Sequence, residues 1–251
     1  MKEMNYFEAI NKRKSIRKYD MSPLDNKVLT EISDKIANLK PMCPEIKTEI
    51  KLVTEKDVKA LMQIKAPHYI MVFSEVKEDY LTNIGFMLQQ MDLYLSANGI
   101  GSCWQGMPRP TKEILNTSKL QFVIVLAFGK PSEPLYREST DEFKRKSLEG
   151  ISNIRDAGEL LEPVRLAPSG INSQPWFFTG TMNRLNAYCA KTNIIKAIIY
   201  EKMNKIDMGI GLCHLWIAAK NIGRDVEFIK DSTAKNNAPS GYYYNTTIEI
   251  R

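Results

Sequence analysis

The segment from Pro168 to Trp176 carries short polar side chains on a backbone that two prolines restrict. Proline fixes φ and has no N–H, so the helix expected before this segment should end here. Gly170 and Asn172 can adopt the positive φ that sharp turns require. Such a loop can present fixed hydrogen-bonding groups to a ligand, through Ser169, Asn172 and Gln174. The alternative is a stiff surface connection, which is common for Pro/Ser/Asn clusters.

Two further segments have residue types that could bind a ligand. Residues 13–17 read Arg-Lys-Ser-Ile-Arg, and an arginine side chain offers a planar fork of donors that suits a phosphate. Residues 99–106 read Gly-Ile-Gly-Ser-Cys-Trp-Gln-Gly, and glycine lets a backbone approach a ligand closely. The alternatives are a solvated basic helix end and an ordinary turn after a helix.

Composition limits the class of protein. The chain has 251 residues, 43% hydrophobic content and a net charge of +6, which is enough for a sizeable core in one large domain or two small ones. The charge suits an anionic small molecule and lacks the basic blocks of a nucleic-acid arm. For that reason we expect no nucleic-acid partner. We also expect no membrane partner, because no apolar run reaches the roughly 18 residues of a membrane span. The start of the chain resembles no signal peptide, so we expect a cytoplasmic protein.

The cysteines give no metal or disulfide signal. They are isolated from one another, and only His68 and His214 could join them as ligands. The four are Cys43, Cys103, Cys189 and Cys213. We therefore expect free thiols and no metal site, and we expect His214, within an apolar helix, to be a satisfied core residue.

The hydrophobic pattern predicts alternating helices and strands. Helices are expected at 6–12 with Asn5 as the N-cap, at 22–38 opening on Ser22-Pro23, and at 56–63, 80–98, 111–115, 157–166 and 202–221. Strands are expected at 45–53, 69–73, 122–128, 176–179, 184–189, 226–229 and 242–250. A turn is expected at 99–104, and the polar stretch 132–146 is the best candidate for a connector.

The two long apolar helices align without a gap. Asn83-Ile84-Gly85 lies over Asp207-Met208-Gly209, and Gly99 then lies over Gly223. This spacing indicates a tandem of two similar α/β units whose central helices are buried on several sides. The halves differ in content, because only the first has the Arg-Lys-Ser-Ile-Arg segment and only the second has the Pro-Ser-Gly loop. Chance resemblance between apolar helices is the alternative.

Together these residues resemble the FMN-dependent nitroreductase family. That family typically has an Arg-x-Ser-x-Arg/Lys motif, like residues 13–17, and a Pro-Ser-x-x-Asn-x-Gln-Pro-Trp loop, like residues 168–176. It also has an apolar helix ending in Gly-Leu-Gly-x-x-Trp-x-Gly, like residues 99–106, where Ile100 replaces the leucine. A strand ending in Gly-Tyr-Pro and then a basic stretch follow in the family, like 129–131, where Lys130 replaces the tyrosine, and 144–149. Here the first and second motifs lie half a chain apart. The chain therefore resembles the fused, single-chain branch, in which one chain supplies both sides of a dimer interface.

The resemblance implies an α+β, three-layer nitroreductase-like fold made of two pseudo-twofold-related halves with buried central helices. The first half would be residues 1–131, the connector 132–156 and the second half 157–251. It implies one FMN, a nicotinamide nucleotide NAD(P)H as reductant, and an electron-poor acceptor such as a nitroaromatic or a quinone, in a ping-pong oxidoreductase. A monomer is expected, with a homodimer as the alternative.

The resemblance also implies which residues hold the cofactor. Arg13 would bind the phosphate. Ser15 and Arg17 would lie nearer the ribityl chain and the N1/O2 edge of the flavin, and Lys14 would be a weaker member of the set. Arg145 would reach the same phosphate. The alternatives are that it belongs to a flexible charged linker, or that residues 145–147 (Arg-Lys-Ser) repeat the first motif. The remaining cofactor-binding residues would be Gln105, Gly106, Pro168, Ser169, Gly170 and Asn172. No catalytic side chain is expected.

Two other functions fit parts of the pattern. A non-catalytic flavin- or nucleotide-binding sensor or storage protein would keep the fold without turnover. An ordinary dinucleotide-binding dehydrogenase is discarded, because its glycine fingerprint follows a strand and opens a helix. Here the glycines at 99 and 101 follow a predicted helix.

Overall fold

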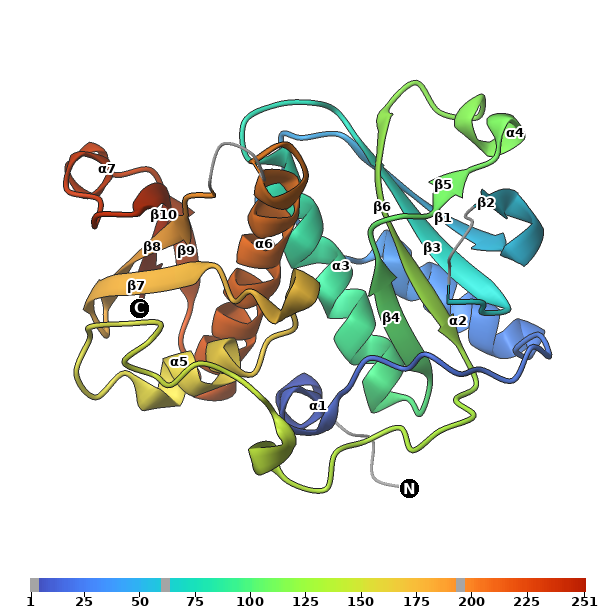
Figure 1. The fold of residues 1–251 in the computed structure, drawn as a ribbon, viewed down its shortest axis with the longest axis horizontal. Coiled ribbons are helices and arrows are strands. Elements are labelled where there is room, and N and C mark those ends of the chain that lie inside the picture. Colours follow the sequence, from blue (N-terminus) through green and yellow to red (C-terminus); the bar gives the residue numbers. More distant parts are fainter. Residues whose placement is uncertain (1–4, 60–63, 193–196) are drawn as a thin grey trace. The chain divides into compact units, whose positions relative to one another are not determined.

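The computed structural model describes residues 5–59, 64–192 and 197–251, and the chain divides into two compact units. Unit 1 comprises residues up to Tyr80 and then Met87–Thr140, and unit 2 comprises Leu81–Phe86 and Asp141–Arg251. Figure 1 shows the elements of both units. The division falls within α3 (Tyr80–Ala97), so one helix contributes to both units. Each unit is described by itself below.

Unit 1 is built around a four-stranded antiparallel sheet with the order β1-β3-β6-β4. The strands are β1 (Thr48–Thr54), β3 (His68–Ser74), β4 (Gly101–Gln105) and β6 (Gln121–Gly129). Every residue of β3 is buried, as expected for a central strand rich in aromatic and β-branched residues. The other elements are α1 (Tyr6–Lys12), α2 (Asn26–Ala37), η1 (Glu55–Asp57), α4 (Lys112–Leu115), and β2 (Val58–Lys59), which pairs with β5 (Arg109–Pro110).

Unit 2 has a second four-stranded antiparallel sheet, with the order β7-β8-β10-β9. The strands are β7 (Trp176–Thr181), β8 (Arg184–Ala190), β9 (Val226–Ile229) and β10 (Tyr242–Ile250). The helices are η2 (Thr140–Glu142) at the boundary, α5 (Gly158–Arg165), η3 (Gly170–Asn172), α6 (Ala197–Asn221) and α7 (Ser232–Asn236).

The two units share one topology. In each sheet the strands stand in the order first, second, fourth and third along the chain, and the long helix comes between the second strand and the third. The equivalent helices are α3 and α6, which are the two that the sequence repeat aligns. The repeat in sequence therefore coincides with a repeat in topology.

Aligned glycines meet where the first turns of α3 cross α6 in unit 2. A Cβ on Gly85 would lie 2.0 Å from the carbonyl oxygen of Ile206, and a Cβ on Gly209 would lie 1.9 Å from that of Thr82. The same spacing of 124 residues separates Gly85 from Gly209 and Thr82 from Ile206. The contact is thus reciprocal. Only glycine permits backbones this close.

The segment after α1 is held against residues 130–137 within unit 1. Backbone N–H groups of Asp20, Ser132 and Arg137 donate to Lys130, Lys18 and Lys12 respectively, at 2.8–2.9 Å. The first part of the polar stretch 132–146 is therefore bonded to this segment.

Most predicted elements are confirmed, and three predictions are wrong. The second helix begins at Asn26 and not at Ser22-Pro23, because the Leu24 N–H donates to Nε2 of His68 at 2.9 Å and holds the chain outside a helix. Of the helix predicted at 56–63, residues 58–59 instead form the strand β2, because Val58 pairs with Pro110 of β5. Positions 60–63 lie outside the described residues. The expected turn at 99–104 is limited to its first residues, because β4 begins at Gly101.

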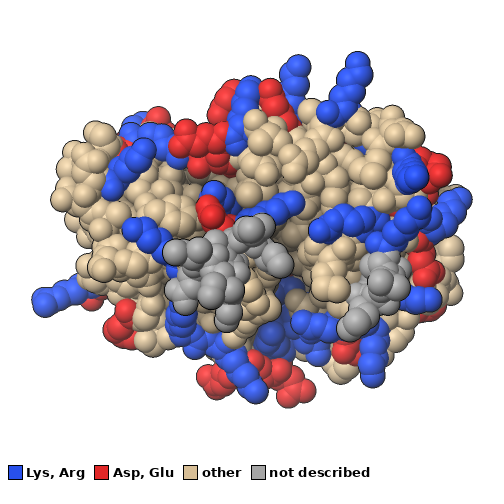
Figure 2. All heavy atoms as spheres, turned by 45° about the horizontal axis from the view of Figure 1, so that its top comes forward, with Lys and Arg blue, Asp and Glu red and all other residues tan. Residues whose placement is uncertain are grey.

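Two surface properties concern partners. None of the helices in the described ranges is long and apolar enough to cross a membrane. On the face drawn in Figure 2, Lys and Arg side chains are scattered with Asp and Glu between them.

Candidate functional site

Arg13 is the best-defined cation of unit 1. Its side chain is only 1% exposed, and its Nε lies 3.0 Å from Oδ2 of the fully buried Asp92. Its Nη2 donates to the hydroxyl of Ser15 at 3.2 Å. Within the described ranges no hydrogen-bond partner is found for Nη1. One edge of the guanidinium is thus fixed, and the other edge is available to an anion.

Asp92 is the hub that fixes this arginine. It also accepts a hydrogen bond from the Ser102 hydroxyl at 2.5 Å and one from Nε2 of Gln89 at 3.1 Å. Gln89 in turn accepts from the indole N–H of Trp104 at 3.2 Å. A buried carboxylate is costly unless its lone pairs are satisfied, and this network satisfies them.

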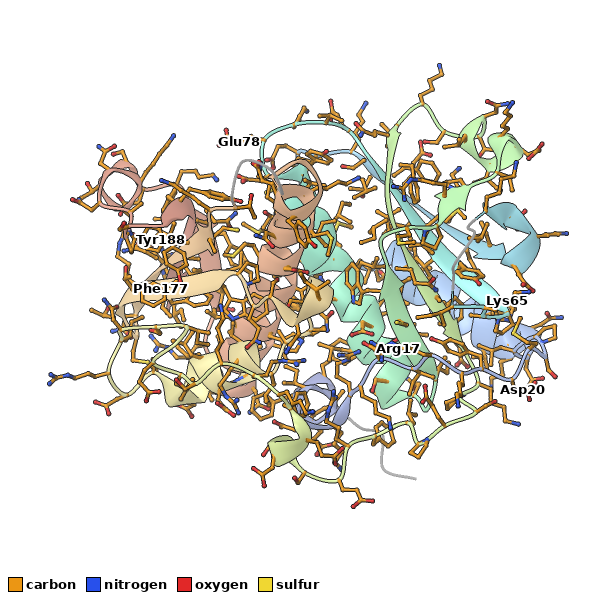
Figure 3. All side chains as sticks on the ribbon, viewed as in Figure 1. Arg17, Asp20, Lys65, Glu78, Phe177 and Tyr188 are labelled. Carbon is orange, nitrogen blue, oxygen red and sulfur yellow. The ribbon has the colours of Figure 1, made fainter. Side chains whose placement is uncertain are left out.

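The residues after Arg13 turn their charges outward. Ile16 is fully buried in the core of unit 1, and Gly101 makes this possible, since a Cβ there would lie 2.9 Å from the Ile16 side chain. Arg17, labelled in Figure 3, is exposed. Its backbone N–H donates to Glu133 at 2.6 Å, and this bond lowers the pKa of the Glu133 carboxyl. The half-buried Lys14 also lies within electrostatic reach of Glu133.

Gln105 is buried and hydrogen-bonded, whereas the neighbouring Gly106 is exposed. The buried Gln105 side chain braces a backbone: it accepts from the Ile64 N–H at 3.2 Å and donates to the Ile64 carbonyl at 3.0 Å. Gly106 is exposed, and a Cβ there would meet no atom within 4 Å. The Gln105 side chain is therefore committed to the fold, whereas open space lies beside Gly106.

In unit 2 the Pro-Ser-Gly loop has a strained backbone. Three residues other than glycine have positive φ, namely Ile171 at 49°, Asn172 at 59° and Gln174 at 45°. Each such residue costs on the order of 1–3 kcal/mol, and a β-branched one is a genuine outlier. The Ile171 side chain is nevertheless 73% exposed. The fold thus maintains, against strain, an apolar side chain at the surface of a polar loop.

Residues 144–146 hold one side of this loop. Arg145 donates to Oδ1 of Asn172 at 2.7 Å and to the Ala167 carbonyl at 3.2 Å. The Asn172 amide donates to the Lys144 carbonyl at 2.7 Å. The backbone N–H of Lys146 donates to Oε1 of Gln174 at 2.7 Å, and the Lys146 ammonium donates to the Gln174 carbonyl at 2.8 Å. Arg145 therefore lies at the loop, although most of its donors face protein.

Asp207 of α6 holds the other side. Its two carboxylate oxygens accept the Gly170 N–H at 3.1 and 3.0 Å, and Oδ2 accepts the Ser173 hydroxyl at 3.4 Å. The loop leaves through Trp176, which is fully buried and packs on the helix at Gly211. Pro168 is buried and Ser169 is half-buried; the Ser169 hydroxyl accepts the Gln174 N–H at 2.9 Å.

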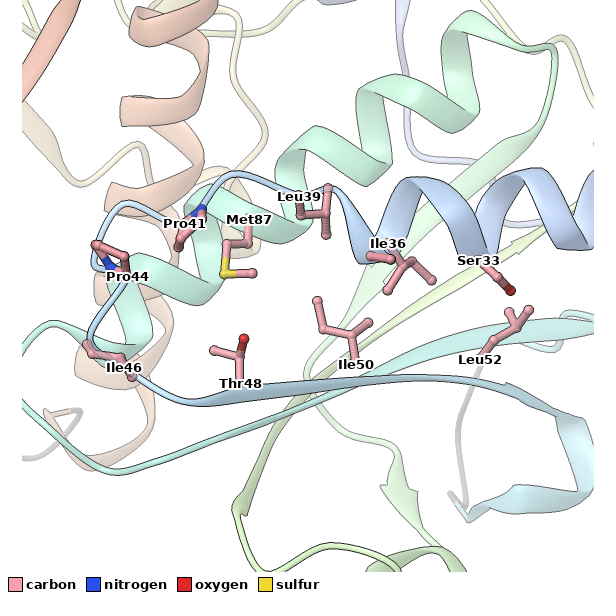
Figure 4. Close-up of a pocket in the computed structure, with 11 residues that line it drawn as sticks. Ser33, Ile36, Leu39, Pro41, Pro44, Ile46, Thr48, Ile50, Leu52 and Met87 are labelled. Atoms are coloured by element: carbon pink, nitrogen blue, oxygen red, sulfur yellow. The ribbon is translucent and has the colours of Figure 1, made fainter.

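Unit 1 also has a cavity of about 580 Å³ between α2 and β1 (Figure 4). Its lining is mainly aliphatic, and none of the predicted cofactor-binding residues belongs to it. The lining residues are Ser33, Ile36, Ala37, Leu39, Pro41, Pro44, Ile46, Thr48, Ile50, Leu52 and Met87.

Sequence reasoning assigned no role to the two acids that organise these half-sites. Asp92 and Asp207 are both buried on long apolar helices. The signal was present, because acids are almost never fully buried unless they have partners. The predicted core role of His214 is confirmed, since it is buried and its Nδ1 lies 2.8 Å from the Pro163 carbonyl. All four cysteines are free thiols.

Residues 5–219 match a family model described as "Putative TM nitroreductase". The chain belongs to this nitroreductase family. The resemblance inferred from the motifs is therefore confirmed, and the family is one of oxidoreductases. No curated protein sequence matches the chain.

A solved structure supports the fold of this nitroreductase-family chain. A crystal structure described as a "putative nitroreductase" from Thermotoga maritima is 23% identical, covers 100% of this chain and 94% of its own, and has a TM-score of 0.68. The α+β nitroreductase-like fold is thus confirmed. Lower similarities are found to a nitroreductase family protein of Clostridium difficile 630, with 18% identity, coverages of 58% and 95% and a TM-score of 0.46. An FMN-dependent nitroreductase of C. difficile R20291 has 16% identity, coverages of 53% and 95% and a TM-score of 0.43.

Proposed function

We propose that this chain is an FMN-dependent NAD(P)H oxidoreductase that reduces electron-poor acceptors, such as nitroaromatics or quinones, in a ping-pong cycle. The observation that carries the proposal is Arg13, a buried guanidinium that Asp92 and Ser15 fix on one side while Nη1 stays available. A phosphate is the group that a preset arginine fork binds best. The residues present therefore fit the phosphate of FMN.

The other residues have complementary roles in this proposal. Arg145 adds a second cation toward the phosphate, and Lys14 adds a weaker one. Arg17 would lie toward the flavin ring, where its charge would favour the anionic reduced form. When bound, FMN supplies the electron-transfer chemistry, so no side chain has to act as acid, base or nucleophile.

The backbone supplies the remaining contacts in this proposal. The Gln105 and Asn172 side chains are already bonded within the protein, so these residues offer backbone groups. The open space beside Gly106 suits close approach of a ring. Pro168, Ser169 and Gly170 cover the flavin from the loop, whose rigidity keeps the cost of ordering low.

We further propose that the chain is a pseudo-dimer whose halves, 1–131 and 157–251 joined by 132–156, enclose one flavin. The shared topology and the reciprocal contact of Gly85 and Gly209 support this relation. A chain with both sides of an isologous interface can act as a monomer.

The test is titration of the purified chain with FMN, followed by NAD(P)H oxidation with a nitroaromatic or quinone acceptor. Arg17→Ala removes an exposed cation and should weaken FMN binding about tenfold, since a charge-assisted hydrogen bond contributes roughly 1.5–3 kcal/mol. Adding Arg13→Ala should abolish binding. Arg155→Ala, at an exposed arginine outside the half-sites, is the matched control. A protein that never binds FMN refutes the proposal, and FMN binding without turnover favours the sensor or storage alternative.

A further inference from the structure

We propose that Asp207 is the positioning residue of the Ser169–Gln174 loop, and that docking of this loop on α6 is coupled to the protonation of its carboxyl group. This inference rests on the proposed function only in giving the loop a cofactor to cover. The geometry comes from unit 2 alone.

The first observation is how closely the loop docks on the helix. A Cβ on Gly170 would lie 2.2 Å from Cε of Met203 and 3.6 Å from Oδ2 of Asp207. Both oxygens of Asp207 accept the same N–H, that of Gly170. The carboxyl therefore contacts the loop at the residue that precedes the strained Ile171 and Asn172.

The second observation is that the carboxyl is enclosed. Asp207 is only 4% exposed, and its hydrogen-bond partners within the described ranges are the Gly170 N–H and the Ser173 hydroxyl. Neither partner is a cation. A carboxylate with so few donors and little water is poorly stabilised in its charged form.

Among the charged and titratable groups around Asp207, only its own carboxyl changes protonation near neutral pH. From β8, Cys189 faces it, and burial raises the pKa of that thiol to about 12. From β10, burial raises the pKa of the Tyr243 hydroxyl, which lies against Cys189. On α6 itself, Lys205 and Glu201 form an ion pair at 2.8 Å. The loop contributes no ionisable group in contact.

Burial raises the pKa of Asp207 to about 7, and the sign of the coupling follows. The Gly170 N–H and the Ser173 hydroxyl of the docked loop lower the pKa of the carboxyl, but desolvation outweighs them, so the docked state favours the protonated form. In the proposed undocked state water would reach the carboxylate and return its pKa toward the ordinary value. Docking is therefore coupled to proton uptake, and a rise of pH from about 4 to about 7 progressively favours undocking. The twin position in the repeat is Asn83, an amide that cannot titrate.

The experiment measures amide hydrogen-exchange protection of the loop in FMN-free protein, corrected for the intrinsic pH dependence of exchange. In wild type, the protection factor at Gly170 should fall about tenfold or more from pH 6 to pH 8. Asp207→Asn keeps an acceptor and cannot ionise, so it should hold protection constant with pH. Asp207→Ala should lower it about tenfold at every pH, as expected for the loss of a buried acceptor. Asp225→Asn, at an acid 81% exposed, is the control and should behave as wild type.

Two results would overturn the proposal: the same pH dependence in wild type and Asp207→Asn, or unchanged protection in Asp207→Ala. If Asp207→Ala does not fold, the comparison of wild type with Asp207→Asn decides. FMN titration is a separate readout, in which wild-type affinity should weaken as pH rises from about 4 to about 7 and that of Asp207→Asn should not. A coupled loop in a protein that never binds FMN would refute the proposed function and leave the role of Asp207 intact.

Discussion

Replacing Gly209 with alanine should destabilise the protein, against the usual rule for helices. Alanine is favoured over glycine within a helix by about 1 kcal/mol. At Gly209, however, the added Cβ would lie 1.9 Å from the Thr82 carbonyl oxygen, where real Cβ contacts are essentially never under 3.0 Å. The two helix backbones must therefore separate by about 1 Å, which loosens every side chain packed around the crossing.

The magnitude follows from these two opposing effects. Overpacking costs roughly 1–3 kcal/mol, and a backbone collision belongs at the upper end, so after the gain in helix propensity the net loss is about 2 kcal/mol. For a chain of this size that corresponds to a fall in Tm of about 4–8 °C. Gly85→Ala should cost a similar amount because the contact is reciprocal. The double variant should cost less than the sum, since both substitutions separate the same two backbones.

The assay is thermal and urea unfolding of each variant beside Gly158→Ala. Gly158 lies in α5, and a Cβ there would meet only Cδ1 of Leu148, at 3.9 Å. The control should therefore be stabilised by up to about 1 kcal/mol. If Gly209→Ala is stabilised to the same extent as the control, the close crossing of α3 and α6 is refuted, and the support that it gives to the pseudo-dimer is lost.

Three further outcomes are expected. Asp92→Ala leaves the Arg13 guanidinium buried without its counter-charge and should cost about 3–5 kcal/mol in urea unfolding, whereas replacing both residues with apolar ones should recover most of the loss. The free energy of unfolding of wild type should fall relative to Asp207→Asn as pH rises from about 4 to about 7, because the folded-state pKa is raised; parallel pH profiles would contradict this. Glu133 has a lowered pKa, so its contribution should be present above its ordinary pKa and lost on acidification, and Glu133→Gln should flatten the acid limb of the unfolding profile.

The sequence correctly predicts the elements that consist of long, continuous apolar runs. The strands around 69–73 and 122–128 and the two long helices are confirmed, because continuous apolar runs leave few alternatives. The errors fall where a distant partner decides. A side chain on β3, His68, delays the start of α2, and β5 captures residues 58–59 as a strand. Local sequence propensity cannot predict either of these distant partners.

The candidate site shows the same limit at the level of single residues. The motifs around Arg13 and Gly170 can be recognised in the sequence through their resemblance to the motifs of the nitroreductase family. Their supports cannot, since Asp92 contacts a residue 79 positions away and Asp207 one 37 positions away. An acid in an apolar helix indicates that a partner exists, but its identity requires the fold.

The repeat gives these acids a meaning beyond their contacts. At the spacing that aligns the glycines, the twin of Asp92 is Trp216, which packs its ring against Phe86 at 5.5 Å and offers no charge for an arginine. The twin of Asp207 is Asn83, which cannot ionise. Each of the two long helices, α3 and α6, therefore has one buried acid where the other has a residue unable to replace it. The two equivalent helices thus have different buried supports, one for a cation and one for a loop, so the two repeats are not interchangeable.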